Sequence, residues 1–120
     1  MESHQLPVYN KARLLYLQLE RSTQKVPLNM KRGKIAEIEG KVFDLMCDIS
    51  DANEQEKDKR ARLEYISQAI KRLHRVKVMV RVLYDLNVIT KKGFGAIVMA
   101  EENVARQLAG WEKSTISSAE

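Results

Sequence analysis

The sequence predicts an all-α protein, folded as an antiparallel up-and-down four-helix bundle. Apolar residues recur at spacings of three and four along most of the chain, which is the period of one helix face. Only five glycines and two prolines occur, too few for the frequent turns of a β-sandwich or barrel. With 120 residues, of which 44% are hydrophobic, the chain is expected to be one domain, residues 1–120, around one core.

The first two helices follow a short lead, residues 1–7, that is expected to be flexible. The first helix is predicted from about Val8 to Lys25, and Pro27 ends it. The second is predicted from about Lys31 to Ala52, and a close helix–helix approach would explain Gly40 within it. The first apolar stripe consists of Tyr9, Ala12, Leu15, Tyr16 and Leu19. The second has the heptad spacing of packed helices and consists of Ile35, Ile38, Val42, Leu45, Met46 and Ile49.

The third helix is predicted from about Glu54 to Leu86, after a turn at Asp51–Glu54. The segment Val76–Val82 alternates partly like a strand, and valine favours strands. We favour a helix there, because the helical stripe continues through the segment in phase and no second strand is available to pair with it. The stripe consists of Leu63, Ile66, Ile70, Leu73, Val80, Leu83 and Tyr84.

The fourth helix follows a connection at Asn87–Thr90, where the Thr90 hydroxyl is a plausible N-cap. It is predicted to run to about Trp111, before a polar tail at Ser114–Glu120 of which residues 115–120 are expected to be flexible. Its stripe is broken by Glu101 and consists of Phe94, Ile97, Val98, Val104, Leu108 and Trp111.

Neither histidine nor the single cysteine lies in a catalytic or metal-binding pattern. His74 lies among the cations Lys71, Arg72, Arg75 and Lys77, and no second His or Cys lies at ligand spacing. His4 belongs to the lead. Cys47 lies in an apolar run without a basic activator and is predicted to be a small buried residue. We therefore expect a protein that is not an enzyme, with no catalytic residue, no metal and no cofactor.

The chain carries no recognisable targeting signal. Its first residues lack the basic region and apolar stretch of a signal peptide. No apolar run approaches the roughly 18 residues that a membrane span needs. The sequence is therefore interpreted as that of a cytoplasmic protein with no membrane partner.

Positive charge is concentrated between Lys57 and Arg81. Nine basic residues there face two acidic ones, so the segment carries +7 whereas the whole chain carries +5. At about 100° per residue, most of these cations fall opposite the apolar stripe and form a basic ridge. Such a ridge predicts a polyanionic partner, RNA or DNA; a solvated face is the alternative, although solvated faces usually mix both signs. The candidate nucleic-acid-binding residues are Arg60, Arg62, Lys71, Arg72, His74, Arg75, Lys77 and Arg81.

Two valines indicate self-association. Val78 and Val82 fall on the ridge side of the third helix, outside its core stripe. From Val76 to Tyr84 the helix is apolar nearly all round, and such a helix is usually buried on more than one side. We therefore expect a homo-oligomer with Val78 and Val82 at its interface, in preference to two isolated exposed valines.

The order and spacing of four segments carry a family resemblance. The segments are Tyr9–Leu19 with Lys11-Ala-Arg, Leu73-His-Arg-Val, Asp85-Leu-Asn-Val-Ile-Thr and Arg106-Gln-Leu-Ala-Gly-Trp. Over about residues 6–114 the chain resembles the four-helix-bundle proteins related to those encoded in rRNA intervening sequences. It is most similar to the Avd-type accessory proteins of diversity-generating retroelements. Gly33-Lys-Ile-Ala-Glu lacks the proline that the rRNA-intervening branch usually has at this point, which favours the Avd-like branch.

This resemblance implies a ring-shaped homopentamer with a basic surface. It further implies that the protein binds nucleic acid and a partner reverse transcriptase, and supports the copying of a template RNA into mutagenised cDNA. Two other interpretations are a protein–protein scaffold, whose ridge meets an acidic partner, and an enzyme subunit, for which the sequence offers no residues. Salt-sensitive binding to RNA distinguishes the first of these from the nucleic-acid interpretation.

Overall fold

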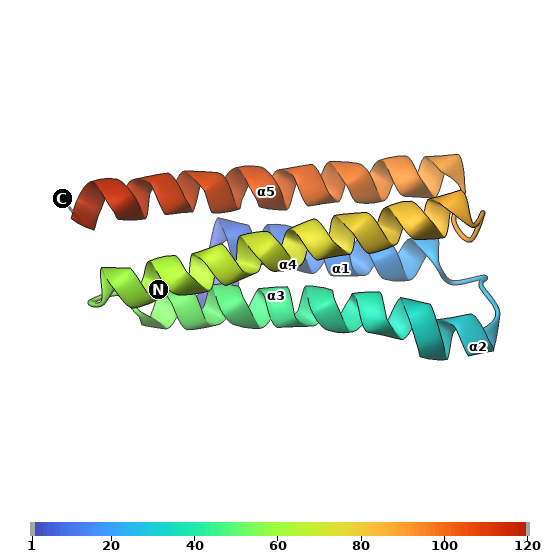
Figure 1. Ribbon diagram of the computed structural model, residues 1–120, viewed down its shortest axis with the longest axis horizontal. Helices are drawn as coiled ribbons and strands as arrows, with labels where there is room; N and C mark the ends of the chain where they lie inside the picture. Colours follow the sequence, from blue (N-terminus) through green and yellow to red (C-terminus); the bar gives the residue numbers. More distant parts are fainter. Residues whose placement is uncertain (1, 120) are drawn as a thin grey trace.

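The computed structural model describes residues 2–119 and is all-helical, with no strand in that part of the chain. Four long helices lie side by side along an axis of 49 Å (Figure 1). The all-α prediction is therefore confirmed. Met1 and Glu120, the outermost residues of the two predicted tails, lie outside the described residues. The long helices are α1 (Pro7–Ser22), α3 (Ala36–Glu54), α4 (Lys59–Asp85) and α5 (Lys91–Ala119).

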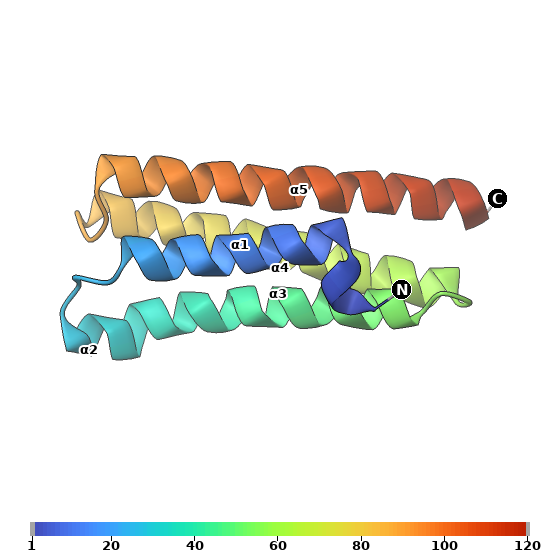
Figure 2. The same ribbon diagram turned by 180° about the vertical axis from the view of Figure 1, so that it is seen from behind.

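Three short elements complete the chain. The 3-10 helix η1 (Ser3–Gln5) precedes α1, while α2 (Leu28–Met30) and the π-helical turn η2 (Lys31–Ile35) lead directly into α3. Figures 1 and 2 both show α2 and the α4–α5 connection at one end of the molecule. The α3–α4 connection and the C-terminal end of α5 lie at the other end.

Each long helix packs against two others: α1 and α4 each contact both α3 and α5. This arrangement sets α1 and α4 at opposite corners around one apolar core. Full burial contributes about 1.5–3 kcal/mol for each large aliphatic side chain, so the core outweighs helix propensity in holding the bundle together. The predicted stripes supply buried residues to it, namely Ala12, Leu15, Leu19, Ile35, Ile38, Val42, Leu45, Ile49, Ile66, Leu73, Val80, Leu83, Ile97, Val104 and Leu108.

The turn predicted at Asp51–Glu54 is wrong, because α3 remains helical through these residues. Ala52 continues the heptad spacing and is fully buried, so the core extends one turn further than the large apolar residues indicated. The connection lies instead between Glu54 and Lys59. Asp58 caps α4 there: its Oδ1 accepts a hydrogen bond from the Ala61 amide at 3.1 Å.

The fourth predicted helix is also longer than expected, since α5 continues through the predicted polar tail to Ala119. Thr115 is buried and its hydroxyl donates to the Trp111 carbonyl oxygen at 2.8 Å. Further along, Lys59 Nζ of α4 donates to Ser118 Oγ at 2.7 Å. Hydroxyl groups that bond back to the helix or across to α4 thus replace the apolar side chains on which the sequence prediction depended.

At the N-terminal side, α1 ends at Ser22 rather than at Lys25. Thr23 is fully buried, and its hydroxyl donates to the Leu19 carbonyl oxygen at 2.8 Å, competing with continuation of the helix. The lead contains the helical turn η1, whose Ser3 Oγ lies 2.8 Å from Ser50 Oγ of α3.

The α4–α5 connection is a compact turn with both helix ends capped. Asn87 adopts a left-handed backbone conformation, with φ of 59°. Its amide donates to the Tyr84 carbonyl oxygen at 3.0 Å and the Val88 amide donates to the Leu83 carbonyl oxygen at 2.9 Å, which is a Schellman motif. Thr90 is the N-cap of α5, as predicted: its Oγ1 accepts a hydrogen bond from the Gly93 amide at 3.0 Å.

Candidate nucleic-acid interface

Three cations among the eight predicted ridge residues, with one histidine beside two of them, form an exposed basic surface on α4. Arg60, Lys71, His74 and Arg75 are exposed. None of them forms an ion pair or a side-chain hydrogen bond with any other described residue. Their positions at intervals of three, four and eleven keep them on one side of the helix, as the sequence predicted.

Arg72 is turned toward α3 and belongs to a salt-bridge cluster. Its Nε donates to Asp48 Oδ2 at 2.8 Å, and its Nη1 lies 3.7 Å from Asp44 Oδ2. The hydrogen bond that Arg72 donates to Asp48 is the main cause that raises the pKa of the Arg72 guanidinium. Because Asp48 is only 6% exposed, the Arg72 guanidinium neutralises a buried carboxylate within the bundle. Arg72 is therefore less available than the exposed cations to an external anion.

Arg62 lies on the core side of α4 and caps the end of α3. Its Nε donates to the Ala52 carbonyl oxygen at 2.9 Å and its Nη2 to the Asn53 carbonyl oxygen at 3.2 Å. The guanidinium also sits 5.6 Å from the centre of the Trp111 ring. These contacts assign Arg62 to the bundle rather than to the ridge.

The remaining two predicted residues also have partners in the chain, although Arg81 is exposed. Lys77 is half-buried beside the buried carboxyl group of Glu101. Arg81 Nε lies 3.1 Å from Asp85 Oδ1, and its guanidinium stands 5.8 Å from the ring centres of both Tyr84 and Phe94. Those two rings stack on each other at 4.3 Å.

Sequence reasoning missed one cation, Lys41 of α3, that joins the ridge. Together with Gln68, Lys71, Arg72 and Arg75, it lines a shallow hollow of about 150 Å³ between α3 and α4. We call this hollow the α3–α4 basic groove. Lys41 lies in a different predicted helix, so only the pairing of α3 with α4 brings it next to Lys71 and Arg75. Two elements therefore contribute cations to one surface, where they can contact neighbouring phosphates.

No family model, curated protein or solved structure matches this chain. Within the described residues, no group of three or more His, Cys, Asp or Glu side chains is placed to hold a metal ion. None of the described helices is long and apolar enough to cross a membrane.

Cys47 is exposed, which corrects the prediction of a small buried residue. It lies one turn after Phe43 on the outer face of α3, and Phe43 is itself 58% exposed. The apolar residues next to Cys47 in the sequence therefore did not indicate that Cys47 is buried. Partial burial, followed by the nearby acids Asp44, Asp51 and Asp48, raises the pKa of the Cys47 thiol, so the environment does not activate it as a nucleophile.

The two valines proposed for an oligomer interface are exposed on the isolated chain. Val78 is 53% and Val82 45% exposed. Both line a small, largely apolar hollow of about 190 Å³ between the start of α3 and the second half of α4, with Ile38 and Met79 among its other walls. The core of the single chain thus leaves them uncovered.

Proposed function

We propose that the chain is a non-enzymatic nucleic-acid-binding accessory protein that works as an oligomer alongside a reverse transcriptase. The observation that supports nucleic-acid binding is the exposed basic surface of Arg60, Lys71 and Arg75, which have no ion-pair partner among the described residues and are joined by Lys41 across the α3–α4 basic groove. Like charges kept close together without acidic partners repel one another, and a polyanion relieves that repulsion. The reverse transcriptase and the pentameric assembly rest on the sequence resemblance alone.

The proposed architecture of the chain is an antiparallel up-and-down four-helix bundle. It is supported by the short connections between α3 and α4 and between α4 and α5. The alternating positions of these connections at the two ends of the molecule also favour it (Figures 1 and 2). In this arrangement α4 presents a long, straight outer face, which suits contacts to successive phosphates of one strand.

The test is a double charge reversal, Lys71→Glu with Arg75→Glu, measured by fluorescence anisotropy with a labelled single-stranded RNA. We expect at least a tenfold loss of affinity at moderate salt, equally for unrelated sequences, because phosphate contacts carry no sequence information. The slope of log affinity against log salt should flatten by about 1.4, since each lost phosphate contact removes about 0.7.

The matched control is Arg13→Glu with Lys113→Glu, which makes the same change in net charge at exposed positions of α1 and α5. Affinity in this control should stay within about threefold of the parent. If both pairs weaken binding equally, net charge and not the ridge drives it. If RNA affinity is unchanged by the ridge variant while binding of a reverse transcriptase is lost, the ridge is a protein-docking surface and the scaffold interpretation replaces ours.

A further inference from the structure

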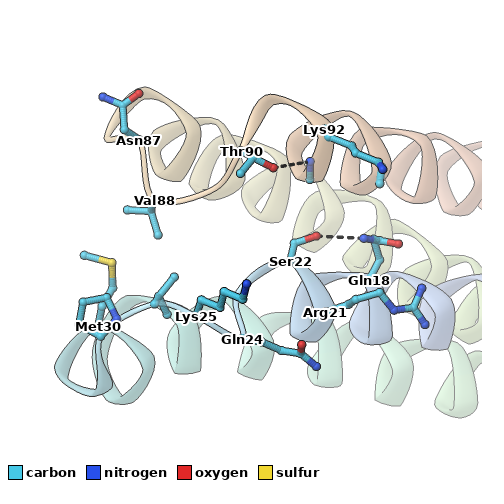
Figure 3. Close-up of a pocket in the computed structure, with 14 residues that line it drawn as sticks. Gln18, Arg21, Ser22, Gln24, Lys25, Met30, Asn87, Val88, Thr90 and Lys92 are labelled. Atoms are coloured by element: carbon cyan, nitrogen blue, oxygen red, sulfur yellow. Dashed lines mark hydrogen bonds between the residues drawn. The ribbon is translucent and has the colours of Figure 1, made fainter.

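A second basic surface lies at the end of the bundle where α1 ends and α5 begins. An open cleft of about 780 Å³ is found there, which is within the usual size range of small-molecule sites. Figure 3 shows its walls: Val88, Thr90 and Lys92 come from the α4–α5 connection and the start of α5, while Ser22, Lys25 and Met30 come from α1, the following loop and α2. The sequence predicted the Thr90 cap here but no binding site.

All the charged side chains that line the cleft are positive. Arg21, Lys25 and Lys92 line it and are exposed, and none of them forms an ion pair within residues 2–119. No acidic residue is among the described residues that line it. Residues 21–34 and 86–100, which supply all the lining residues except Gln18, contain seven basic residues and no acidic one. A concave site walled by cations of one sign concentrates the field and attracts an anion.

The neutral residues of the cleft add two other kinds of contact. Gln24 and Asn87 line it, and their side-chain amides form no hydrogen bond with other described residues, so they can recognise a polar edge. Val26, Met30 and Val88 supply apolar surface, with Met30 and Val88 on opposite sides of the opening in Figure 3. Cations, free amides and an apolar wall together suit a ligand with a phosphate group at one end and a flat, partly polar ring at the other.

One wall of the cleft is preformed by backbone hydrogen bonds. The Schellman motif at Asn87 and the Thr90 cap hold the α4–α5 connection in one conformation. On the facing side, Gln18 Nε2 donates to Ser22 Oγ at 2.9 Å within α1. A wall that is already ordered loses little conformational entropy when a ligand binds.

We propose that this cleft binds a 5′-phosphorylated nucleoside, either free or at the end of a nucleic-acid strand. Arg21, Lys25 and Lys92 hold the phosphates, Gln24 and Asn87 meet the base or sugar, and the apolar wall covers the ring. The site is distinct from the ridge: Arg75 lies ten residues, roughly 15 Å of helix, before the end of α4. The inference therefore goes beyond the proposed function and does not depend on it.

The test is isothermal titration calorimetry of the full chain with ATP, adenosine and inorganic triphosphate at low salt without magnesium. We expect ATP to bind at least tenfold more tightly than adenosine and at least threefold more tightly than triphosphate. Absence of ATP binding at millimolar concentration overturns the proposal. Triphosphate binding as tightly as ATP overturns the nucleoside assignment.

Substitutions test whether ATP binds in this cleft. Arg21→Gln with Lys92→Gln should weaken ATP binding at least tenfold, whereas the control Arg13→Gln with Lys113→Gln should change it less than twofold. An equal loss in both pairs overturns the proposal. Lys71→Glu with Arg75→Glu should leave ATP binding unchanged, so failure of the ridge and failure of the cleft are distinguishable. Chemical-shift changes on ATP addition should centre on the amides of Ser22, Asn87 and Gly93 in the unmodified chain, and shifts centred on the ridge instead contradict the site.

A final comparison distinguishes a free nucleotide from the end of a nucleic-acid strand as the ligand. Two oligonucleotides of one sequence, with a 5′-triphosphate and with a 5′-hydroxyl, are compared. A preference for the triphosphate that Arg21→Gln with Lys92→Gln abolishes supports capture of a strand end. Equal affinity for both strands, with ATP binding retained, supports the free nucleotide as the ligand of the same cleft.

Discussion

Glu101 places a carboxyl group inside the bundle, on the core side of α5. It is 3% exposed, and its Oε2 has no hydrogen-bond partner among the described residues. Burial raises the pKa of Glu101 from 4.5 to about 7, against the opposing effect of the nearby Lys77 ammonium. Glu39 of α3 shows the same behaviour: burial first, and then the neighbouring Glu20, raise its pKa to about 7. The bundle therefore holds two carboxyl groups that bind protons more tightly when folded than when unfolded.

The folded bundle should consequently lose stability as pH rises from about 4.5 to 7. In this range the unfolded Glu101 carboxyl has released its proton while the folded one keeps it, so ionisation favours the unfolded chain. Glu101→Gln removes the ionisation. We expect it to raise the free energy of unfolding at pH 8 by about 1–3 kcal/mol relative to the parent, and to have little effect at pH 4.5. Urea denaturation at the two pH values measures the difference.

The matched control is Glu102→Gln, which neutralises the adjacent, exposed carboxyl group. It should change stability by less than about 0.5 kcal/mol at either pH. An equal effect of Glu101→Gln at pH 4.5 and pH 8 would show that the Glu101 carboxyl is not held protonated in the bundle.

At the scale of the helix, α3 contains a glycine, Gly40, that no contact with another helix requires. A close helix–helix approach would have explained Gly40, and the described bundle has none at this position. Gly40 is exposed, a Cβ added there would meet no atom within 4 Å beyond the neighbouring backbone of its own helix, and its φ is not positive. Gly40 thus costs α3 backbone entropy and nothing in the described bundle compensates for it.

Gly40→Ala should stabilise the protein by about 0.5–1 kcal/mol, because alanine has the higher helix propensity and finds open space. Thermal unfolding followed by circular dichroism should show a midpoint higher by a few degrees. Gly93→Ala is the contrasting variant: its Cβ would lie 3.2 Å from Thr90 Oγ1 and 3.4 Å from the Ser22 side chain, so its gain should be smaller or absent. A lower midpoint for Gly40→Ala would indicate that a partner packs against this face.

At the scale of the whole molecule, apolar surface and positive charge lie next to each other on α4. Val78 and Val82 are about half exposed, one and two turns beyond Arg75, and no further helix among the described residues covers that side of α4. A second copy packed there would bury both valines, and it would repeat the ridge once per subunit. Several ridges in one assembly would engage a long polyanion with an avidity that a single chain lacks.

We therefore expect an oligomer at micromolar concentration in sedimentation equilibrium. Val78→Glu should shift the mass toward the 13.8 kDa monomer, because it places a charge in a desolvated contact. Ser117→Glu adds the same charge at an exposed position of α5 and should leave the mass unchanged. A parent protein that sediments only as the monomer would remove self-association from the proposed function.

Much of the fold could be predicted from the sequence because each helix carries its own apolar period. The stripes from Ala12 to Leu19, from Ile35 to Ile49 and from Ile97 to Leu108 supply buried residues as expected, although Tyr16, Met46 and Val98 within them are only partly buried. The Thr90 cap and the cationic face of Arg60, Lys71 and Arg75 were likewise predictable. These features depend on spacing within one helix, which the order of residues determines by itself.

The tertiary structure decided everything that depends on a neighbouring helix. It directed Arg62 to the end of α3 and Arg72 to Asp48, and it added Lys41 to the ridge. It also brought Arg21 and Lys92, which are 71 positions apart in sequence, into one cleft at the end of the bundle. The physical reason is that the interactions of a charge depend on which opposite charges and carbonyl oxygens lie within a few ångströms. Helical periodicity defines the face on which a residue lies, but the packing of the four helices determines what that face meets.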